Sequence, residues 1–275
     1  MNQYKVTGNK KIKLKKFDAE DTSGVENREQ ADQETDQLVQ KIADHQMRLF
    51  VDGTQALLVI LQGMDGSGKD GTVRRVFGRV NPAGVFVHSF KEPTPLELSH
   101  DFLWRVHQQV PARGMIGVFN RSYYEDVLIV RVHQDELLPA RLKSQKDLWE
   151  WRFELINHFE EMLVRERVHI LKFFLHISKE EQRRRFIDRQ QTPAKQWKFN
   201  SGDLYERSFW DDYQKAYEDA LRHTSTDYAP WYIVPSDKKW YRNWVIASTI
   251  AKTLGKLDLH PPKIEDEALL NVKIE

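Results

Sequence analysis

Cysteine is absent from the 275-residue sequence. Its absence excludes disulfide frameworks, zinc sites built from thiolates and cysteine nucleophiles, and it fits a reducing compartment. Long apolar runs are also missing, because the longest, residues 56–61, is far shorter than the ~20 residues that a membrane-spanning helix needs. The basic N-terminus, residues 1–17, lacks the apolar region of a secretory signal. The sequence therefore predicts a cytoplasmic protein with no membrane association, whose chemistry relies on carboxylates, bases and backbone groups.

The overall charge is nearly balanced, with a formal net charge of +1 and 40% hydrophobic residues, which is ordinary for a globular protein. A chain of this length can bury one sizeable core, so we expect residues 1–275 to form a single domain with an N-terminal extension, residues 1–50. Charge is uneven along the chain: residues 18–36 are mostly acidic and residues 178–200 mostly basic. Such blocks are usually solvated faces, so neither decides the function alone.

Five short apolar runs predict buried strands, and longer amphipathic segments between them predict helices. The predicted strands are residues 56–62, 85–90, 115–119, 168–177 and 231–234. The predicted helices are residues 69–80, 96–110, 144–167, 203–222 and 240–254. This alternation favours a doubly wound α/β fold, with a mainly parallel five-stranded sheet covered on both faces. Ligands bind such sheets beyond the carboxyl ends of the strands, so we expect the chemistry there.

The first predicted strand leads directly into a glycine-rich loop, Gly63-Met64-Asp65-Gly66-Ser67-Gly68-Lys69-Asp70-Gly71-Thr72. This segment satisfies the G-x-x-x-x-G-K pattern in the strand-to-helix context that the motif requires. Glycines allow backbone N–H groups to turn toward phosphate oxygens, the following helix adds its positive N-terminal end, and Lys69 adds a full charge. The loop predicts a polyanionic ligand. A glycine-rich turn that binds nothing is the weaker alternative.

One position of the loop departs from the usual pattern. Asp70 stands where a Ser or Thr would place a hydroxyl on magnesium. Asp65 can offer a hard oxygen to Mg²⁺ instead, and Thr72 can add a hydroxyl. The alternative for Asp65 is a helix cap, which we consider weaker.

The third predicted strand ends in a second polar turn, Asn120-Arg121-Ser122-Tyr123-Tyr124-Glu125-Asp126. P-loop enzymes commonly keep a metal-binding carboxylate where Asn120 stands, so we assign the metal, Mg²⁺ with Mn²⁺ as an alternative, to Asp65 and Asp126. Glu125 is expected to shape the acceptor site. Arg121 can bind two phosphate oxygens through its planar fork. Alternatively, Arg121 and Asp126 form a structural ion pair.

Residues 178–202 predict a helical lid. Ser178 begins a helix on which Arg185 and Arg189 are four residues apart, so the two are expected to point together at one polyanion. Lys198 adds a cation beside Trp197. Closure of such a lid excludes water from the reacting phosphates. The alternatives are a solvated basic helix and a nucleic-acid-binding patch.

These segments resemble polyphosphate kinase family 2, through the loop at residues 63–72, the segment Phe119-Asn120-Arg121-Ser122-Tyr123-Tyr124-Glu125-Asp126-Val127-Leu128 and the lid. The similarity runs from about residue 13 to near the C-terminus. It implies a thymidylate-kinase-like P-loop kinase fold with a helical lid, and functional roles for Asp65, Lys69, Arg121 and the lid arginines. Many family members have Asp-Arg after the third strand, whereas this chain has Asn120-Arg121. That variant resembles the class III branch, which uses nucleoside mono- and diphosphates.

The resemblance also implies that residues following the second strand line the acceptor nucleotide pocket. They are Lys91, Pro93 and Thr94. An ordinary turn stiffened by proline is an equally good interpretation of this segment.

The sequence therefore predicts a reversible phosphotransferase that moves the terminal phosphoryl group of inorganic polyphosphate to AMP, ADP, GMP or GDP. A conventional ATP-dependent nucleoside monophosphate kinase, which shares the loop and the lid, is the first alternative. A non-enzymatic nucleic-acid binder with a nucleotide switch is the second, and we expect no nucleic-acid partner. The acidic N-terminal helix and the aromatic C-terminal segment favour a homo-oligomer.

Overall fold

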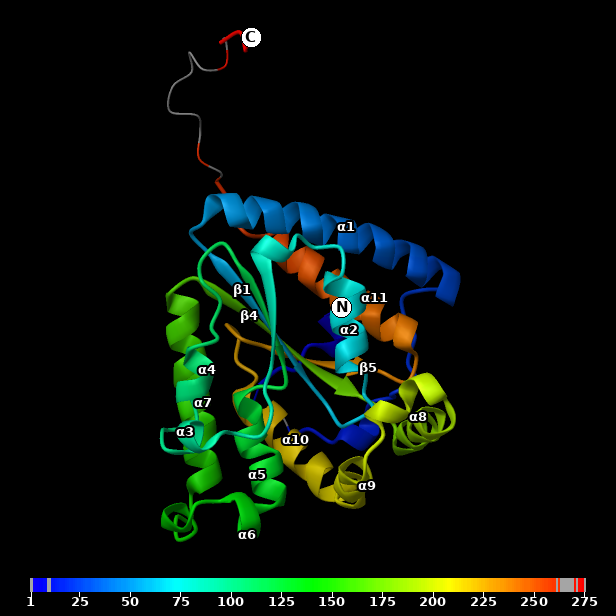
Figure 1. The fold of residues 1–275 in the computed structure, drawn as a ribbon, viewed down its shortest axis with the longest axis vertical. Helices are drawn as coiled ribbons and strands as arrows, with labels where there is room; N and C mark the ends of the chain where they lie inside the picture. Colours follow the sequence, from blue (N-terminus) through cyan, green and yellow to red (C-terminus); the bar gives the residue numbers. More distant parts are fainter. Residues whose placement is uncertain (1, 9–10, 261, 263–269, 271, 275) are drawn as a thin grey trace.

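The computed structural model describes residues 2–8, 11–260, 262, 270 and 272–274. At its centre is a five-stranded sheet in the order β2-β3-β1-β4-β5, in which every pair of neighbouring strands is parallel (Figure 1). The strands are β1 (Ala56–Gln62), β2 (Val85–Ser89), β3 (Ile116–Asn120), β4 (Val168–His176) and β5 (Trp231–Pro235). Each differs from its predicted range by at most one residue at either end. The predicted doubly wound α/β fold is confirmed.

The central strand β1 is buried along its whole length because both faces of the sheet are covered. Leu58 and Ile60 belong to the core on one face, and Leu57 and Val59 belong to the core on the other. A strand buried on both sides needs apolar residues at every position rather than at alternate ones. This requirement explains why the sequence of β1 is a continuous apolar run.

Helices cover both faces of the sheet (Figure 1). One face packs against α1 (Arg28–Asp52), α2 (Lys69–Phe77) and α11 (Lys239–Leu254), and the other against α7 (Leu148–Arg165) and α10 (Trp210–Thr224). The remaining helical elements are α3 (Pro95–Leu98), α4 (Trp104–His107), α5 (Ile129–Val132), α6 (Gln134–Leu137), α8 (Lys179–Gln191), α9 (Ser201–Ser208) and the 3₁₀ turns η1 (Asn2–Tyr4), η2 (Leu14–Lys16), η3 (Pro82–Gly84), η4 (Tyr123–Val127), η5 (Ala140–Leu142) and η6 (Pro193–Lys198).

Helix α1 is an outer layer of the fold, packed along α11, and it occupies about half of the predicted N-terminal extension, residues 1–50. The Asn27 side chain caps its start by accepting a hydrogen bond from the Gln30 N–H at 2.9 Å. Gly53, in the left-handed region with φ of 65°, ends it. Buried residues such as Ile42 and Leu49 recur on one face, so the helix is held by packing against α11.

Two predicted helices are interrupted. In the segment 96–110, the Ser99 hydroxyl donates to the Leu96 carbonyl at 2.7 Å, and the Asp101 carboxylate accepts from the Leu103 N–H at 2.9 Å. Such side-chain bonds to the backbone compete with helical ones, and the segment forms the short helices α3 and α4. The segment 203–222 is divided between α9 and α10 at Phe209, whose ring packs against His133 with centroids 4.7 Å apart.

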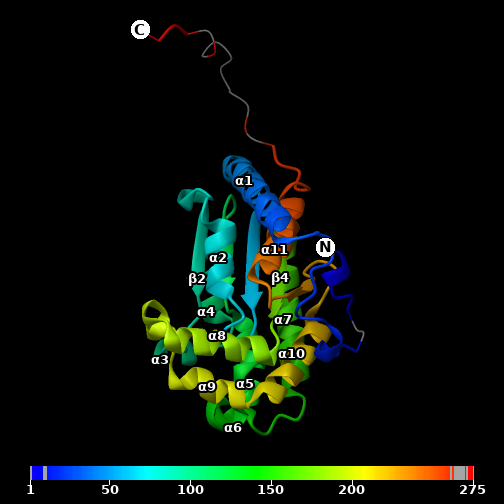
Figure 2. The same ribbon diagram turned by 90° about the vertical axis from the view of Figure 1, so that its right-hand side faces the viewer.

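The carboxyl edge of the sheet is where the loop after β1, the turn after β3 and the lid meet. β1 and β3 are neighbours, with Leu61 beside Asn120, so the segments that follow them lie next to each other. Figure 2 shows α8 and α9 beyond the tip of β1. Among the described residues, no helix combines the length and the apolar character required to cross a bilayer.

Candidate functional site

The loop after β1 has the shape of a phosphate cradle. Gly63 and Gly68 lie in the left-handed region with φ of 152° and 101°, and a Cβ on Gly63 would lie 2.8 Å from the Leu175 carbonyl oxygen. Neither position therefore accepts a side chain. The backbone N–H groups of Gly66, Gly68 and Lys69 find no backbone acceptor among the described residues. Since backbone N–H groups normally find a partner, these groups are available to an anion.

Lys69 spans this loop from the first turn of α2. Its side chain is 8% exposed, and Nζ donates to the Gly63 carbonyl at 2.6 Å and to the Met64 carbonyl at 3.4 Å. Burial lowers the pKa of Lys69, and the negative charge of Asp65 opposes that shift. The ammonium group is therefore held within the cradle with a carboxylate as its counter-charge.

Asp65 and Arg121 join the loop to the turn after β3. The Arg121 guanidinium Nη2 lies 2.8 Å from Asp65 Oδ1. Burial tends to raise the pKa of Asp65, but the charges of Lys69 and Arg121 hold it below its usual value, so Asp65 is ionised at neutral pH. Arg121 has a φ of 65°, a left-handed conformation that costs about 1–3 kcal/mol for a residue other than glycine. Strain of this kind concentrates where a side chain must be held for function.

Glu125, rather than Asp126, lies toward the loop. Burial raises the pKa of Glu125, and the opposing charges are those of Arg121 and Lys69. Burial raises the pKa of Asp126 to about 6, and there the opposing charges are those of Arg152 and Arg105. These differing neighbours show that the two carboxylates point in different directions.

The structure therefore corrects the prediction that Asp126 pairs with Asp65 at a metal. Asp126 Oδ1 lies 3.8 Å from Arg152 Nη1, and Arg152 also donates to the Asp126 backbone carbonyl. The physical reason is the 3₁₀ geometry of η4, in which consecutive side chains point about 120° apart. The alternative ion pair between Arg121 and Asp126 is not formed either, because Arg121 contacts Asp65.

Asp70 connects the loop to the β3 turn and to the lid. Its Oδ1 accepts a hydrogen bond from Asn120 Nδ2 at 2.8 Å, and its Oδ2 lies 3.5 Å from Lys198 Nζ. The lid thus already reaches across the loop. Thr72 differs from its prediction as a metal ligand: its hydroxyl is buried and lies 3.5 Å from Asn243 Oδ1, on the α11 side.

Arg185 and Arg189, predicted to point at one polyanion, have different partners in the structure. Arg185 is 7% exposed, with Nη1 donating to the Gly66 and Ser67 carbonyls at 2.8 and 3.1 Å and Nε donating to Glu181 Oε1 at 2.7 Å. Its Nη2 donates to the carbonyls of Ser236 and Asp237. Arg185 therefore braces the loop through hydrogen bonds to its carbonyls, and its contact with the polyanion stays a prediction. The two arginines share a face of α8 as predicted. At Arg185 this face packs against the loop.

Arg189, one helical turn further along α8, is more exposed than Arg185. Its Nη1 is 3.0 Å from Asp203 Oδ2, and its charge contributes to the low pKa of Asp65. Asp203 was not identified from the sequence as a site residue. Burial raises the pKa of Asp203, and the negative charge of Asp65 adds to the shift, so the two carboxylates are close. The sequence signal at Asp203 was only that of a helix start, because Asn200 caps α9 there.

The segment after β2 has exposed side chains at Lys91, Pro93 and Thr94. The Thr94 hydroxyl accepts from the Glu97 N–H at 3.3 Å, and the Glu97 carboxylate accepts from the Thr94 N–H at 2.7 Å. This reciprocal pair is a capping box that begins α3. This capping role is enough to explain why a threonine stands at position 94. The prediction that this segment lines the acceptor nucleotide pocket stays a prediction.

Comparison with known proteins gives a consistent result. A model of the family described as Polyphosphate kinase 2 matches residues 25–260. An AMP/ADP-polyphosphate phosphotransferase from Meiothermus ruber is 48% identical over 266 residues, covering 96% of this chain and 97% of that protein. An ADP-polyphosphate phosphotransferase from Rhodopseudomonas palustris is 43% identical over 265 residues, covering 95% and 92%. The crystal structure of polyphosphate kinase 2 from Arthrobacter aurescens TC1 is 41% identical and superposes with a TM-score of 0.91, covering 98% of this chain and 94% of that one.

The resemblance inferred from the sequence is thereby confirmed over nearly the whole chain. The loop and the arginine turn meet at one edge of the sheet because they follow the carboxyl ends of neighbouring parallel strands. This chain belongs to the polyphosphate kinase 2 family.

Proposed function

We propose that this protein transfers the terminal phosphoryl group of inorganic polyphosphate to nucleoside mono- and diphosphates, including AMP, ADP, GMP and GDP. The observation that carries the proposal is the cluster of Lys69, Arg121 and free loop N–H groups around the ionised Asp65. Polyphosphate has no base or sugar, so a protein can hold it only by cations, backbone donors and metal. The activity printed for the 48% identical relative from Meiothermus ruber supports the same assignment.

The chemistry required of the side chains is limited. The attacking oxygen of the acceptor phosphate is already ionised, so no strong base is needed, and catalysis rests on in-line positioning and charge neutralisation. Lys69 and Arg121 neutralise charge that spreads over the transferred group, and the loop N–H groups hold its oxygens. The bond broken and the bond formed are both phosphoanhydrides of similar energy. The reaction is therefore reversible, with its direction following the concentrations.

We propose Mg²⁺ as the cofactor, with Mn²⁺ as a substitute. Mg²⁺ usually takes one or two carboxylates, with waters and substrate phosphates completing its shell. Asp65 and Glu125 fit this requirement, because each carboxylate influences the pKa of Lys69 and the two lie toward the same loop. In the described ranges no three His, Cys, Asp or Glu side chains gather as metal ligands. When bound, the ion neutralises phosphate charge.

Two substitutions test which carboxylate serves the phosphates. Glu125→Gln is expected to lower kcat by roughly 100-fold, because an amide neither ligates Mg²⁺ well nor balances Arg121. Asp126→Asn is expected to keep most of the turnover and to lower the melting temperature, since Arg152 loses its counter-charge. Steady-state kinetics with saturating polyphosphate and Mg²⁺ measure the first effect, and thermal unfolding measures the second. An inactive Asp126→Asn beside an active Glu125→Gln would reverse our assignment.

The donor is the decisive test of the function. Purified protein is incubated with Mg²⁺ and polyphosphate, and with AMP, ADP, GMP or GDP in separate reactions, without any ATP. Nucleotides that carry one or two additional phosphates are expected, and chromatography detects them. The alternative ATP-dependent kinase predicts product only when ATP is added. No new anhydride from polyphosphate in any of the four reactions would disprove the proposed function.

The proposals on location and assembly rest on arguments from the sequence alone. We propose that the protein acts in the cytoplasm, where nucleotide acceptors are abundant and a chain without cysteine loses nothing to a reducing environment. The predicted homo-oligomeric state stays a prediction, which size-exclusion chromatography with light scattering can test.

A further inference from the structure

A second buried arginine, Arg242 of α11, lies directly behind the phosphate-binding loop. It is 2% exposed and is among the largest fully buried side chains. Its Nη1 donates to the Ser67 carbonyl at 2.9 Å, and its Nε and Nη2 donate to Asn243 Oδ1 at 3.3 and 3.1 Å. A Cβ on Gly68 would lie 2.0 Å from Nη1, so the loop glycine leaves the space that the guanidinium fills. No sequence motif indicated this residue.

Among the residues that the structure describes, Arg242 forms no ion pair with a carboxylate, unlike the buried cations Arg152, Lys172 and Arg185. Arg185 has Glu181 at 2.7 Å, and Lys172 has Glu160 at 2.5 Å. Burial, and then the positive charge of Arg185, lower the pKa of Arg242 to about 9. The charge that Arg242 adds also contributes to lowering the pKa of Lys239. An arginine side chain remains protonated at neutral pH, so the ligand-free fold holds a buried positive charge without a counter-charge.

Arg242 contacts a peptide unit of the loop whose N–H group is available to an anion. The Ser67 carbonyl that accepts from Arg242 belongs to the same peptide unit as the Gly68 N–H, one of the loop donors available to an anion. Arg185 donates to the same carbonyl from the other side. Hydrogen bonds at the carbonyl end of a peptide unit polarise it and strengthen the donor at the opposite end. A charge in the dry interior also acts over a longer distance than one in water.

We propose that Arg242 is a positioning residue whose buried charge is balanced by the bound phosphate chain, which raises the affinity of the loop for polyphosphate and lowers the stability of the ligand-free protein. The proposal rests on the proposed function in one respect, that the ligand of the loop is a phosphate polymer. A side chain that merely braced the loop would contribute to stability with and without ligand. The charge model instead predicts opposite effects on the two states.

The test compares Arg242→Gln, which keeps an N–H donor and loses the charge, with Arg242→Lys, which keeps the charge and loses the fork. The probe is tripolyphosphate with Mg²⁺ and no nucleotide, so that binding is measured without turnover. Thermal unfolding gives the melting temperature with and without the probe, and isothermal titration gives the dissociation constant. Arg222→Gln is the control, since it removes an arginine charge from α10, on the opposite face of the sheet.

Arg242→Gln is expected to bind tripolyphosphate about tenfold more weakly than wild type while its ligand-free melting temperature stays equal or rises. Its ligand-induced shift in melting temperature is then smaller, and Arg242→Lys recovers most of the affinity. An affinity of Arg242→Gln within twofold of wild type overturns the proposal. Equal losses of affinity in both variants also overturn it, because the fork rather than the charge would then matter. Transfer assays on the wild type, run in parallel, decide the proposed function independently, because tripolyphosphate binding does not require transfer.

Discussion

Replacing Lys69 with alanine is expected to reduce phosphoryl transfer by about three orders of magnitude or more, a loss of about 4 kcal/mol of transition-state stabilisation. The substitution removes the one full positive charge that the loop itself carries, at a position that is 8% exposed and therefore poorly screened by water. Arg121 cannot replace it, because that guanidinium is fixed by its contact with Asp65 at 2.8 Å. The loss should appear mainly in kcat, since developing charge on the transferred group is greatest in the transition state.

The fold should survive this substitution, because the hydrogen bonds that Lys69 Nζ donates within the described part of the chain go to the carbonyls of Gly63 and Met64, inside the loop itself. Circular dichroism and a melting temperature close to that of wild type check this expectation. Lys215→Ala is the matched control, because it removes an exposed lysine of α10 and should leave kcat unchanged. Retention of a tenth or more of the wild-type kcat in Lys69→Ala would contradict the role that we assign to this side chain.

The features that local patterns determine were predictable from the sequence. A strand buried on both faces requires a continuous apolar run, and β1 is therefore recognisable without any knowledge of its neighbours. The loop was recognisable for a similar reason, since positions such as Gly68 accept only glycine. Both features depend on the chain within a few residues of the position itself. The order of the strands and the edge at which ligands bind then follow from general rules of parallel sheets.

The errors concern side chains whose direction depends on tertiary packing. Helical spacing correctly placed Arg185 and Arg189 on one face of α8, but only the docking of that helix on the loop shows that Arg185 is buried. Glu125 and Asp126 are adjacent carboxylates, and the 3₁₀ turn that separates their directions had no clear sequence signal. Arg242 is distant from the loop in sequence, so its contact with Ser67 becomes visible only in the structure.

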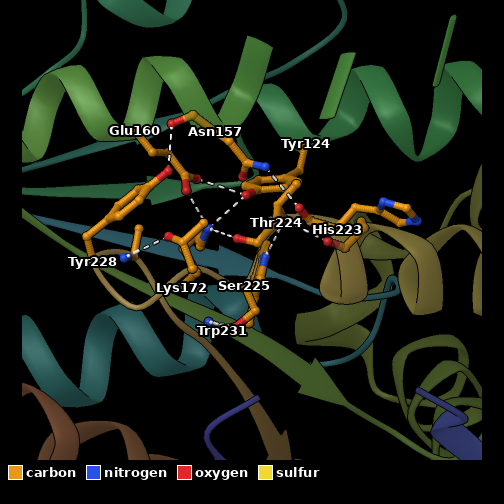
Figure 3. A network of polar contacts seen from close by, with 12 residues as sticks. Tyr124, Asn157, Glu160, Lys172, His223, Thr224, Ser225, Tyr228 and Trp231 are labelled. Carbon is orange, nitrogen blue, oxygen red and sulfur yellow. Dashed lines mark hydrogen bonds and ion pairs between the residues drawn. The ribbon is translucent and has the colours of Figure 1, made fainter. Parts of the chain in front are cut away.

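A buried polar network beneath the arginine turn provides the second large expected effect (Figure 3). Lys172 of β4 and Glu160 of α7 are both 0% exposed, and Lys172 Nζ lies 2.5 Å from Glu160 Oε2. The other carboxylate oxygen of Glu160 accepts from the hydroxyls of Tyr123 and Tyr124 at 2.7 and 2.8 Å. Lys172 also donates to the Thr224 carbonyl at 2.6 Å, at the end of α10. The network thus joins β4, α7 and α10 to η4, the turn that contains Glu125.

Lys172→Met is expected to lower the free energy of unfolding by about 3–5 kcal/mol, because it leaves Glu160 buried without its counter-charge. The lost hydrogen bond to Thr224 adds to the cost, since an unpaired buried carbonyl is unfavourable. Urea denaturation at 25 °C measures the change. Lys195→Met is the matched control: its salt bridge with Asp188 has both side chains 47% exposed, so the expected loss is below about 1 kcal/mol.

A double substitution separates the charge from the packing. Lys172→Met with Glu160→Gln removes both charges while an amide can still accept from the hydroxyls of Tyr123 and Tyr124, so it should recover much of the stability lost in Lys172→Met. Because η4 contains Glu125, we expect Lys172→Met to lower kcat as well as stability. The double variant should recover both. If Lys172→Met lowers the free energy of unfolding by less than about 1 kcal/mol, a buried Glu160 without its counter-charge is not costly, and our explanation of the pair is wrong. If the double variant is as unstable as Lys172→Met, the loss comes from packing around β4 and not from an uncompensated carboxylate.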